Sequence, residues 1–216
     1  MSTSACRPQP PCFETFDGIG GTAIRAVCFH GRRERDGGGD FLLAARLLGR
    51  AAEKAGVFAQ VRTPGFPKLA GAPDRAVARL SLTPFQNLDV PSSFHLEVVA
   101  DPRLAVIPPM GDALLPGGWL LVNALSPPRS PRSGPAVRFA DLSALAARLG
   151  GPLGVALAAG AWAILGEMEP RMPSDLDYLE HALAEEGADA LPLARASFET
   201  VRHARPAGGP VTRTGS

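Results

Sequence analysis

Short apolar runs alternate along the chain with longer segments of helical periodicity. Runs rich in apolar and β-branched residues predict strands at 24–29, 57–61, 75–82, 95–100, 119–122 and 137–139. Apolar residues recurring every three or four positions predict helices at 40–55, 141–149, 153–166, 174–186 and 191–204. Such alternation is typical of parallel βαβ units with helices on both faces of the sheet. The expected fold class is therefore α/β, with three layers, a mostly parallel Rossmann-like sheet and a helical C-terminal part.

Both ends of the chain differ from this pattern. Residues 1–22 contain several prolines and glycines and no apolar core, so we expect a flexible leader that is not a signal peptide. Residues 206–216 have a similar composition and are expected to form a flexible tail. The folded domain is therefore expected at 23–205. Within it, the uncharged run 149–166 is 18 residues long but contains Pro152 and five glycines, which favours a buried, closely packed helix over a membrane span.

The charge and the cysteine content exclude several classes of protein. Of the 216 residues 20% are charged and the formal net charge is +1, which argues against a nucleic-acid partner held by phosphate contacts. Three cysteines, Cys6, Cys12 and Cys28, are too few for a disulfide framework or a four-thiolate iron–sulfur cluster. We therefore expect a protein of the reducing cytoplasm, with no nucleic-acid or membrane partner.

A glycine-rich segment between the first strand and the first helix is the candidate ligand loop. Its candidate binding residues are Gly31, Arg32, Gly37, Gly38 and Gly39. A loop of this kind directs backbone N–H groups and a helix dipole toward an anion. The spacing nevertheless fits neither the dinucleotide pattern nor a P-loop, and Asp40 at the helix start would repel a phosphate. A ligand-facing loop and a long glycine turn with an arginine-rich tip remain alternatives.

Other residue types indicate no chemistry of their own. The four histidines, His30, His95, His181 and His203, lack ligand spacing to one another or to a cysteine, so no metal site is predicted. His30 is the one histidine beside the glycine loop, and we interpret it as a polar residue at a strand end. The Gly-x-Ser-x-Gly pattern of hydrolases is absent. No catalytic residue is assigned.

Five ordered segments together are similar to one known family. They are Ala44–Ala51, Gly71–Ser81 (Gly-Ala-Pro-Asp-Arg-Ala-Val-Ala-Arg-Leu-Ser), Val98–Pro102, Leu115–Asn123 (Leu-Pro-Gly-Gly-Trp-Leu-Leu-Val-Asn) and Leu149–Pro152. Over roughly residues 24–200 the chain resembles the gamma subunit, or fused gamma domain, of the 2-oxoacid:ferredoxin oxidoreductases such as pyruvate synthase. The family patterns are Gly-Ala-Pro-x-Arg-Ala-x-x-Arg-Ile-Ser and Leu-Lys-Pro-Gly-Gly followed by a strand ending in Asn.

The chain departs from that family at polar and glycine positions. The family's Gly-Arg-Gly-Gly-Gln-Gly becomes Gly31-Arg32, four further residues, and then Gly37 to Asp40, so that Gly39 and Asp40 replace the Gln and the last Gly. The Arg-Arg before Gly-Ala-Pro becomes Leu69-Ala70, and the Asn after Gly-x-Pro is missing. The fold signature is kept while the site signature is eroded. This fits a changed ligand site or a mainly structural subunit.

The resemblance implies a non-catalytic gamma-type subunit of a complex that oxidatively decarboxylates a 2-oxoacid on thiamine diphosphate. Electrons would pass through iron–sulfur clusters to ferredoxin, and coenzyme A would usually accept the acyl group. No cofactor is expected in this chain. Thiamine diphosphate, magnesium and the clusters would belong to alpha, beta and iron–sulfur partner subunits, on which this chain would pack while covering the acyl-acceptor cavity. The loop of Gly31, Arg32 and Gly37–Gly39 would face the acceptor, and Asp40 predicts that coenzyme A is used weakly or not at all.

Two further hypotheses compete with this one. The chain could be a stand-alone α/β protein that has lost its complex and binds a small anion or serves as an interaction module. A dinucleotide-dependent oxidoreductase fits less well, because the glycine spacing is wrong and no acidic ribose-binding residue is suitably placed.

Overall fold

The computed structural model describes residues 25–35, 38–63, 69–87, 89–104, 109–125, 135–187 and 189–207. Its strands are β1 (Arg25–Arg32), β2 (Phe58–Arg62), β3 (Pro73–Ser81), β4 (Phe94–Val99), β5 (Leu114–Asn123) and β6 (Ala136–Ala140). Its helices are α1 (Asp40–Lys54), α2 (Leu142–Leu149), α3 (Leu153–Met168), α4 (Leu176–Glu185) and α5 (Leu191–His203). Each predicted strand and helix is present, with ends that differ by a few residues.

The six strands form one mixed sheet in the order β2-β3-β1-β4-β5-β6. The pairs β1–β4, β4–β5 and β5–β6 are parallel, whereas β3 is antiparallel to both β1 and β2. The connection from β2 to β3, residues 63–72, is shorter than parallel crossovers usually are, which fits the reversed direction of β3. The predicted α/β class with a mostly parallel sheet is confirmed.

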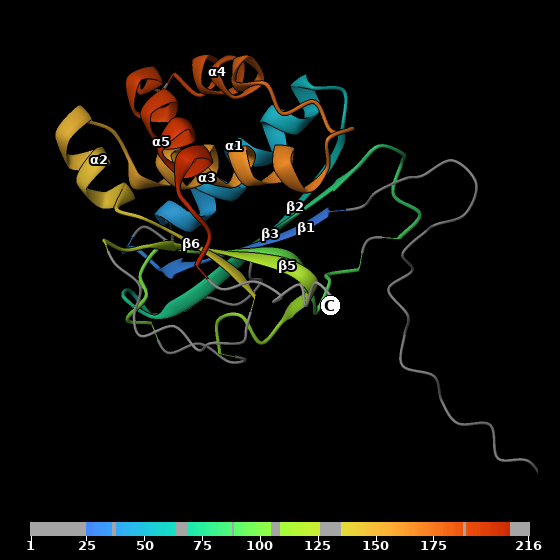
Figure 1. The fold of residues 1–216 in the computed structure, drawn as a ribbon, viewed down its shortest axis with the longest axis horizontal. Coiled ribbons are helices and arrows are strands. Elements are labelled where there is room, and N and C mark those ends of the chain that lie inside the picture. Colours follow the sequence, from blue (N-terminus) through green and yellow to red (C-terminus); the bar gives the residue numbers. More distant parts are fainter. Residues whose placement is uncertain are drawn as a thin grey trace, which may run out of the picture.

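All helices of the described residues lie on one side of the sheet (Figure 1). Helices α1 and α3 pack on the strands, α5 reaches β6, and α4 packs on α1 in an outer layer. The expectation that helices cover both faces is therefore wrong. Helix α1 is the one helix of the described residues that connects two strands, β1 and β2. Helices α2 to α5 follow one another after β6, with no named strand after them. The second face carries a smaller cluster that includes Cys28, Val77 and Phe94.

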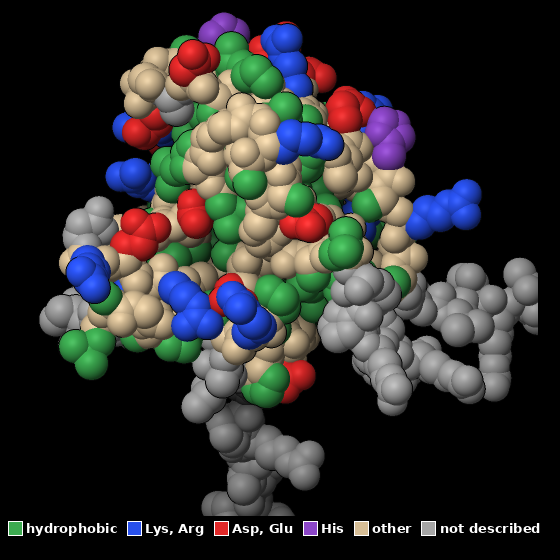
Figure 2. All heavy atoms as spheres, turned by 90° about the vertical axis from the view of Figure 1, so that its left-hand side faces the viewer, with side chains coloured by type: hydrophobic (Ala, Val, Ile, Leu, Met, Phe, Trp, Pro, Cys, Tyr) green, Lys and Arg blue, Asp and Glu red, His purple; other side chains and the backbone are tan. Residues whose placement is uncertain are grey.

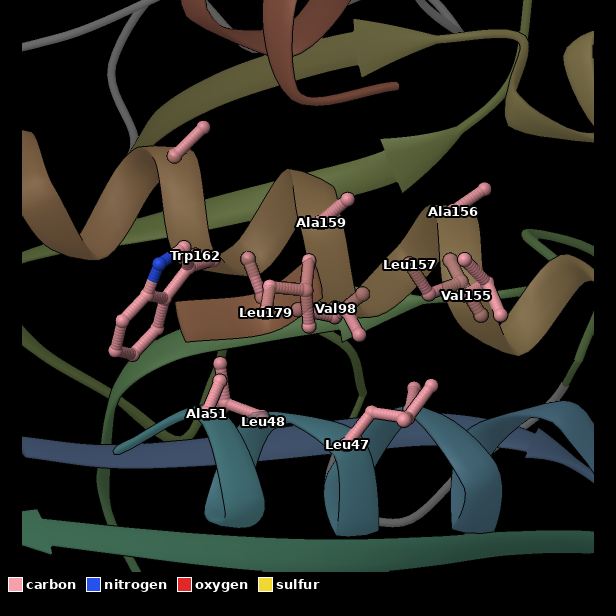
Figure 3. Packing of buried hydrophobic residues seen from close by; sticks show 14 of the residues in the cluster. Leu47, Leu48, Ala51, Val98, Val155, Ala156, Leu157, Ala159, Trp162 and Leu179 are labelled. Atoms are coloured by element: carbon pink, nitrogen blue, oxygen red, sulfur yellow. The ribbon is translucent and has the colours of Figure 1, made fainter. Parts of the chain in front are cut away.

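The main core lies between α1, α3 and the strands beneath them. Figure 3 shows Leu47 and Leu48 of α1 directed toward Leu157 and Trp162 of α3, all of them fully buried. Most residues of α3 are buried, which confirms the closely packed helix predicted for the uncharged run. Helix α3 approaches the sheet closely because it has small residues there: a Cβ on Gly160 would lie 2.9 Å from the Leu121 side chain of β5.

Among the described residues, no helix is both long and apolar enough to cross a membrane.

Several boundaries differ from those expected. Strand β1 continues through Arg32, into the segment predicted as a loop, because its last residues still pair with β3. Strand β5 begins at Leu114, five residues before the predicted strand at 119–122. Ala207, assigned to the tail from sequence, forms an isolated antiparallel bridge with Val137 of β6. The leader 1–22 and residues 208–216 lie outside the described residues.

Candidate functional site

The candidate loop lies where the parallel strands β1, β4 and β5 end. In α/β sheets this carboxyl edge is the usual position of ligand sites. Gly31 and Arg32 close β1, and Gly38 and Gly39 lead into α1, so these four predicted site residues share one corner of the fold. Gly37, the fifth, lies outside the described residues. Helix α3 also begins at this edge, where its Gly154 N–H donates a hydrogen bond to Asp40, the first residue of α1.

The glycines of this loop are required for packing around Phe41. A Cβ on Gly31 would lie 2.8 Å from the Phe41 ring, and one on Gly39 would lie 2.6 Å from the Arg32 carbonyl oxygen. Gly39 also has a φ of 148°, which other residues rarely adopt. Gly39 then accepts the backbone N–H groups of Leu42 and Leu43 at the start of α1. These two glycines therefore allow the close approach of the loop to Phe41 and to the end of β1.

Asp40 joins the N-termini of two helices. It is the first residue of α1, whose N-cap is Gly39, and no side chain caps that helix. Its Oδ1 instead accepts the backbone N–H of Gly154 at the start of α3, at 2.9 Å. Gly154 lies so close that a Cβ there would be 2.6 Å from the Asp40 carbonyl oxygen. The carboxylate thus occupies the position beside two helix N-termini that an anionic ligand would favour.

Two arginines share one carboxylate at the end of β4. Arg32 Nε donates to Asp101 at 2.9 Å, and Arg103 donates to the same carboxylate through its backbone N–H and its side chain. The Arg103 hydrogen bonds, joined by that of Arg32, lower the pKa of Asp101 to about 2. The Asp101 carboxylate is therefore ionised at neutral pH, and the Arg32 guanidinium already has an anionic partner.

The turn before β3 is fastened to the end of β1. Arg33 N donates to the Ala72 carbonyl, Gly71 N donates to the Arg33 carbonyl, and Arg32 Nη1 donates to the Gly71 carbonyl. A further bond, from Ala72 N to the Leu69 carbonyl, closes the turn itself. This turn is the Gly-Ala-Pro segment on which the family resemblance rests most strongly, so the motif builds part of the candidate site.

Two buried polar side chains, His30 and Glu97, lie on the face of the sheet that the described helices do not cover. His30 and Glu97 are almost fully buried, their side chains are 3.7 Å apart, and Glu97 accepts the Gly111 N–H at 2.6 Å. Both ring nitrogens of His30 lack a hydrogen bond in this structure. His30 was predicted as a polar strand-end residue, whereas Glu97 was missed, because a single acidic residue inside an apolar strand gives no spacing signal. Cys28 faces the same side, where burial raises the pKa of its thiol.

The charged side chains at this edge of the sheet are arranged in ion pairs. Among residues 25–207, outside the gaps at 36–37, 64–68, 88, 105–108, 126–134 and 188, no cluster of three His, Cys, Asp or Glu side chains is arranged to hold a metal. Figure 2, which views the side where α2 lies in Figure 1, shows acidic and basic side chains beside one another, with no extended patch of one sign. An anion binding at Arg32 would have to compete with Asp101.

The fold of this chain is also present in solved structures of other proteins. No protein-family model matches the chain, and no curated protein matches its sequence. The pyruvate oxidoreductase subunit of Thermotoga maritima is 21% identical over 82% of this chain and 96% of its own, with a TM-score of 0.63. The gamma subunit of a keto/oxoacid ferredoxin oxidoreductase from Geobacter sulfurreducens is 16% identical over 83% and 95%, with a TM-score of 0.62.

A larger enzyme contains the same fold as one part. The 2-oxoglutarate:ferredoxin oxidoreductase of Magnetococcus marinus, solved with 2-oxoglutarate, coenzyme A and succinyl-CoA bound, gives a TM-score of 0.55 at 13% identity. The match covers 84% of this chain but 30% of that one. At these identities the similarity is one of fold. The chain thus has the fold that the ordered sequence motifs predicted, that of the gamma-type oxidoreductase subunits.

Proposed function

We propose that this chain is a divergent, non-catalytic gamma-type subunit of a thiamine-diphosphate- and iron–sulfur-dependent complex that oxidises a 2-oxoacid and passes electrons to ferredoxin. The observation that carries the proposal is the agreement of two independent signals. The ordered sequence motifs resemble those of this family, and the fold matches 95–96% of the length of two subunits of such enzymes. A fold match by itself would leave function open.

Within the complex, we assign the chain a packing role. The polar groups of the carboxyl edge bind one another: Arg32 and Arg103 bind Asp101, and Asp40 binds the start of α3. Three cysteines in the whole chain cannot supply a four-thiolate cluster. From the resemblance to the family, we propose that thiamine diphosphate, magnesium and the iron–sulfur clusters lie in alpha, beta and iron–sulfur partner subunits, and that this chain covers the cavity in which the acyl acceptor reacts.

The described residues do not fit a phosphate-bearing acceptor such as coenzyme A. The Asp40 carboxylate holds the Gly154 N–H, and Arg32 is paired with Asp101. An anion at the start of α1 would meet a negative charge at the point where a helix N-terminus would otherwise attract it. We therefore propose that the complex uses coenzyme A weakly or not at all. A 2-oxoacid oxidation rate that requires coenzyme A would contradict this.

The test of the subunit role is anaerobic purification of the tagged full chain from its own cells. The purified material is then analysed for visible absorbance, thiamine diphosphate and iron. We expect brown material in which larger chains, thiamine diphosphate and iron accompany this chain. A colourless chain without either cofactor would refute the proposal and favour the stand-alone protein.

A further inference from the structure

Two leucines are exposed at the carboxyl edge of the sheet, on either side of the Arg32–Asp101–Arg103 cluster. Leu69 and Leu125 expose 85% and 84% of their surface, more than the other exposed large apolar residues among those described. Leu69 lies in the turn beside the end of β1, and Leu125 follows the end of β5. We call Leu69, Arg32, Arg103 and Leu125 the edge strip.

The order of the strands sets the dimensions of this strip. Pro73, which follows the Leu69 turn, pairs with Arg32 at the end of β1, and Arg103 follows the end of β4. Strand β5 lies beside β4, and Val99 pairs with Val122, so both strands end at the same level. With neighbouring strands about 4.8 Å apart, the strip is on the order of 15 Å long. This length suits a protein surface better than a small ligand.

Leu69 is held in position although its side chain is exposed. Its turn is tied to the end of β1 by two backbone hydrogen bonds of Arg33 and by the side chain of Arg32. The backbone of this turn is therefore ordered before a partner binds, which lowers the entropy cost of forming an interface there.

The centre of the strip carries a net positive charge. Arg32 and Arg103 share the single carboxylate of Asp101, which leaves one positive charge unbalanced. The guanidinium side chains are 47% and 84% exposed, whereas the Asp101 side chain beneath them is 15% exposed. A complementary surface therefore places a carboxylate over Arg103, whose guanidinium is the more exposed of the two. A second copy of this chain would instead place positive charge there.

We propose that the edge strip is the docking surface of this chain for a protein partner whose surface offers an apolar pocket for Leu69 beside an exposed carboxylate. The inference rests on the proposed function, which makes that partner a subunit of the same complex. Leu125 would make the second apolar contact, on the far side of the arginines. The interface is thus apolar at both ends and ionic at its centre.

In the test, each tagged full-length variant replaces the unaltered chain in its own cells and is purified anaerobically. The variants are Leu69→Asp, Leu125→Asp and Arg103→Glu, and Val90→Asp is the matched control because Val90 is exposed in a connection outside the strip. Thiamine diphosphate and iron are measured per mole of tagged chain. We expect Leu69→Asp to lower both by at least about tenfold, because a charged side chain would enter the apolar pocket proposed for Leu69, and Val90→Asp to leave both within twofold.

Two additional measurements keep the outcomes distinct. Thermal unfolding of each isolated variant shows whether it folds, and the exposed position of Leu69 predicts an unchanged Tm. Sedimentation of the isolated chain shows whether copies associate. If thiamine diphosphate and iron accompany the unaltered chain but Leu69→Asp retains them, the edge strip is overturned while the proposed function stands. A self-associating chain whose dimers are disrupted by Leu69→Asp overturns the assignment to a different partner. If the unaltered chain carries neither cofactor, both proposals fail.

Discussion

Replacing Asp40 by alanine tests the most distinctive contact of the candidate site. The substitution removes the acceptor of the Gly154 N–H, which lies at the buried start of α3. Loss of an N-terminal cap costs about 1 kcal/mol, and a buried donor left without an acceptor costs about 1–3 kcal/mol. We therefore expect the free energy of unfolding to fall by about 1–2 kcal/mol. For a domain of this size that corresponds to a Tm lowered by roughly 2–8 °C.

Two further variants separate the hydrogen bond from the charge. Asp40→Asn keeps an oxygen that can accept the Gly154 N–H and removes the charge, so it should cost a fraction of a kcal/mol, about 0.3–1. Asp177→Ala removes an exposed acidic residue from the first turn of α4, where no comparable contact to another helix is made, and serves as the control. Thermal and urea unfolding of the full chain measure all three. An Asp40→Ala protein as stable as the control would refute the interpretation that this carboxylate fastens α3 to α1.

Other predictions concern packing, pH and thiol reactivity. Gly31→Ala places a methyl group 2.8 Å from the Phe41 ring and should lower the unfolding free energy by about 1–3 kcal/mol in urea titrations. Burial, with a smaller effect of Arg25, lowers the pKa of His95 to about 4, so its neutral ring accepts the Ala26 N–H. Because the folded pKa lies below the unfolded value, stability should fall as the pH drops from about 6.5 to 4, and less so in His95→Gln. Cys28 is buried, so iodoacetamide should label it after unfolding and not before, as peptide mass spectrometry would show.

The sequence predicted the elements of the fold well because each carries a local signal. Helix α1 has apolar residues at helical spacing, and Asp141 caps α2 by accepting the Ala144 N–H as its position suggested. The direction of β3 and the placement of every described helix on one face were not predictable in the same way. They depend on how each connection closes over the sheet, and alternating strands and helices are equally typical of folds covered on both faces.

The candidate site was predicted in part. The sequence marked Asp40 as a departure from the family loop, but its contact with Gly154 joins positions 114 residues apart and has no local signal. Asp101 was noted as part of a strand-end motif and not as the shared partner of Arg32 and Arg103. Ion pairs between loops depend on the register of neighbouring strands, here β1 beside β4, which periodicity alone does not fix.

The central claim is that this chain belongs to a complex that oxidises 2-oxoacids, and the activity of the purified material tests it most directly. The tagged full chain is isolated anaerobically, and reduction of a viologen dye is followed with pyruvate, 2-oxoglutarate and branched-chain 2-oxoacids in turn. The account predicts dye reduction with at least one of these acids, dependent on thiamine diphosphate and retained without added coenzyme A. Absence of reduction with every acid, in material that also lacks thiamine diphosphate and iron, would contradict it.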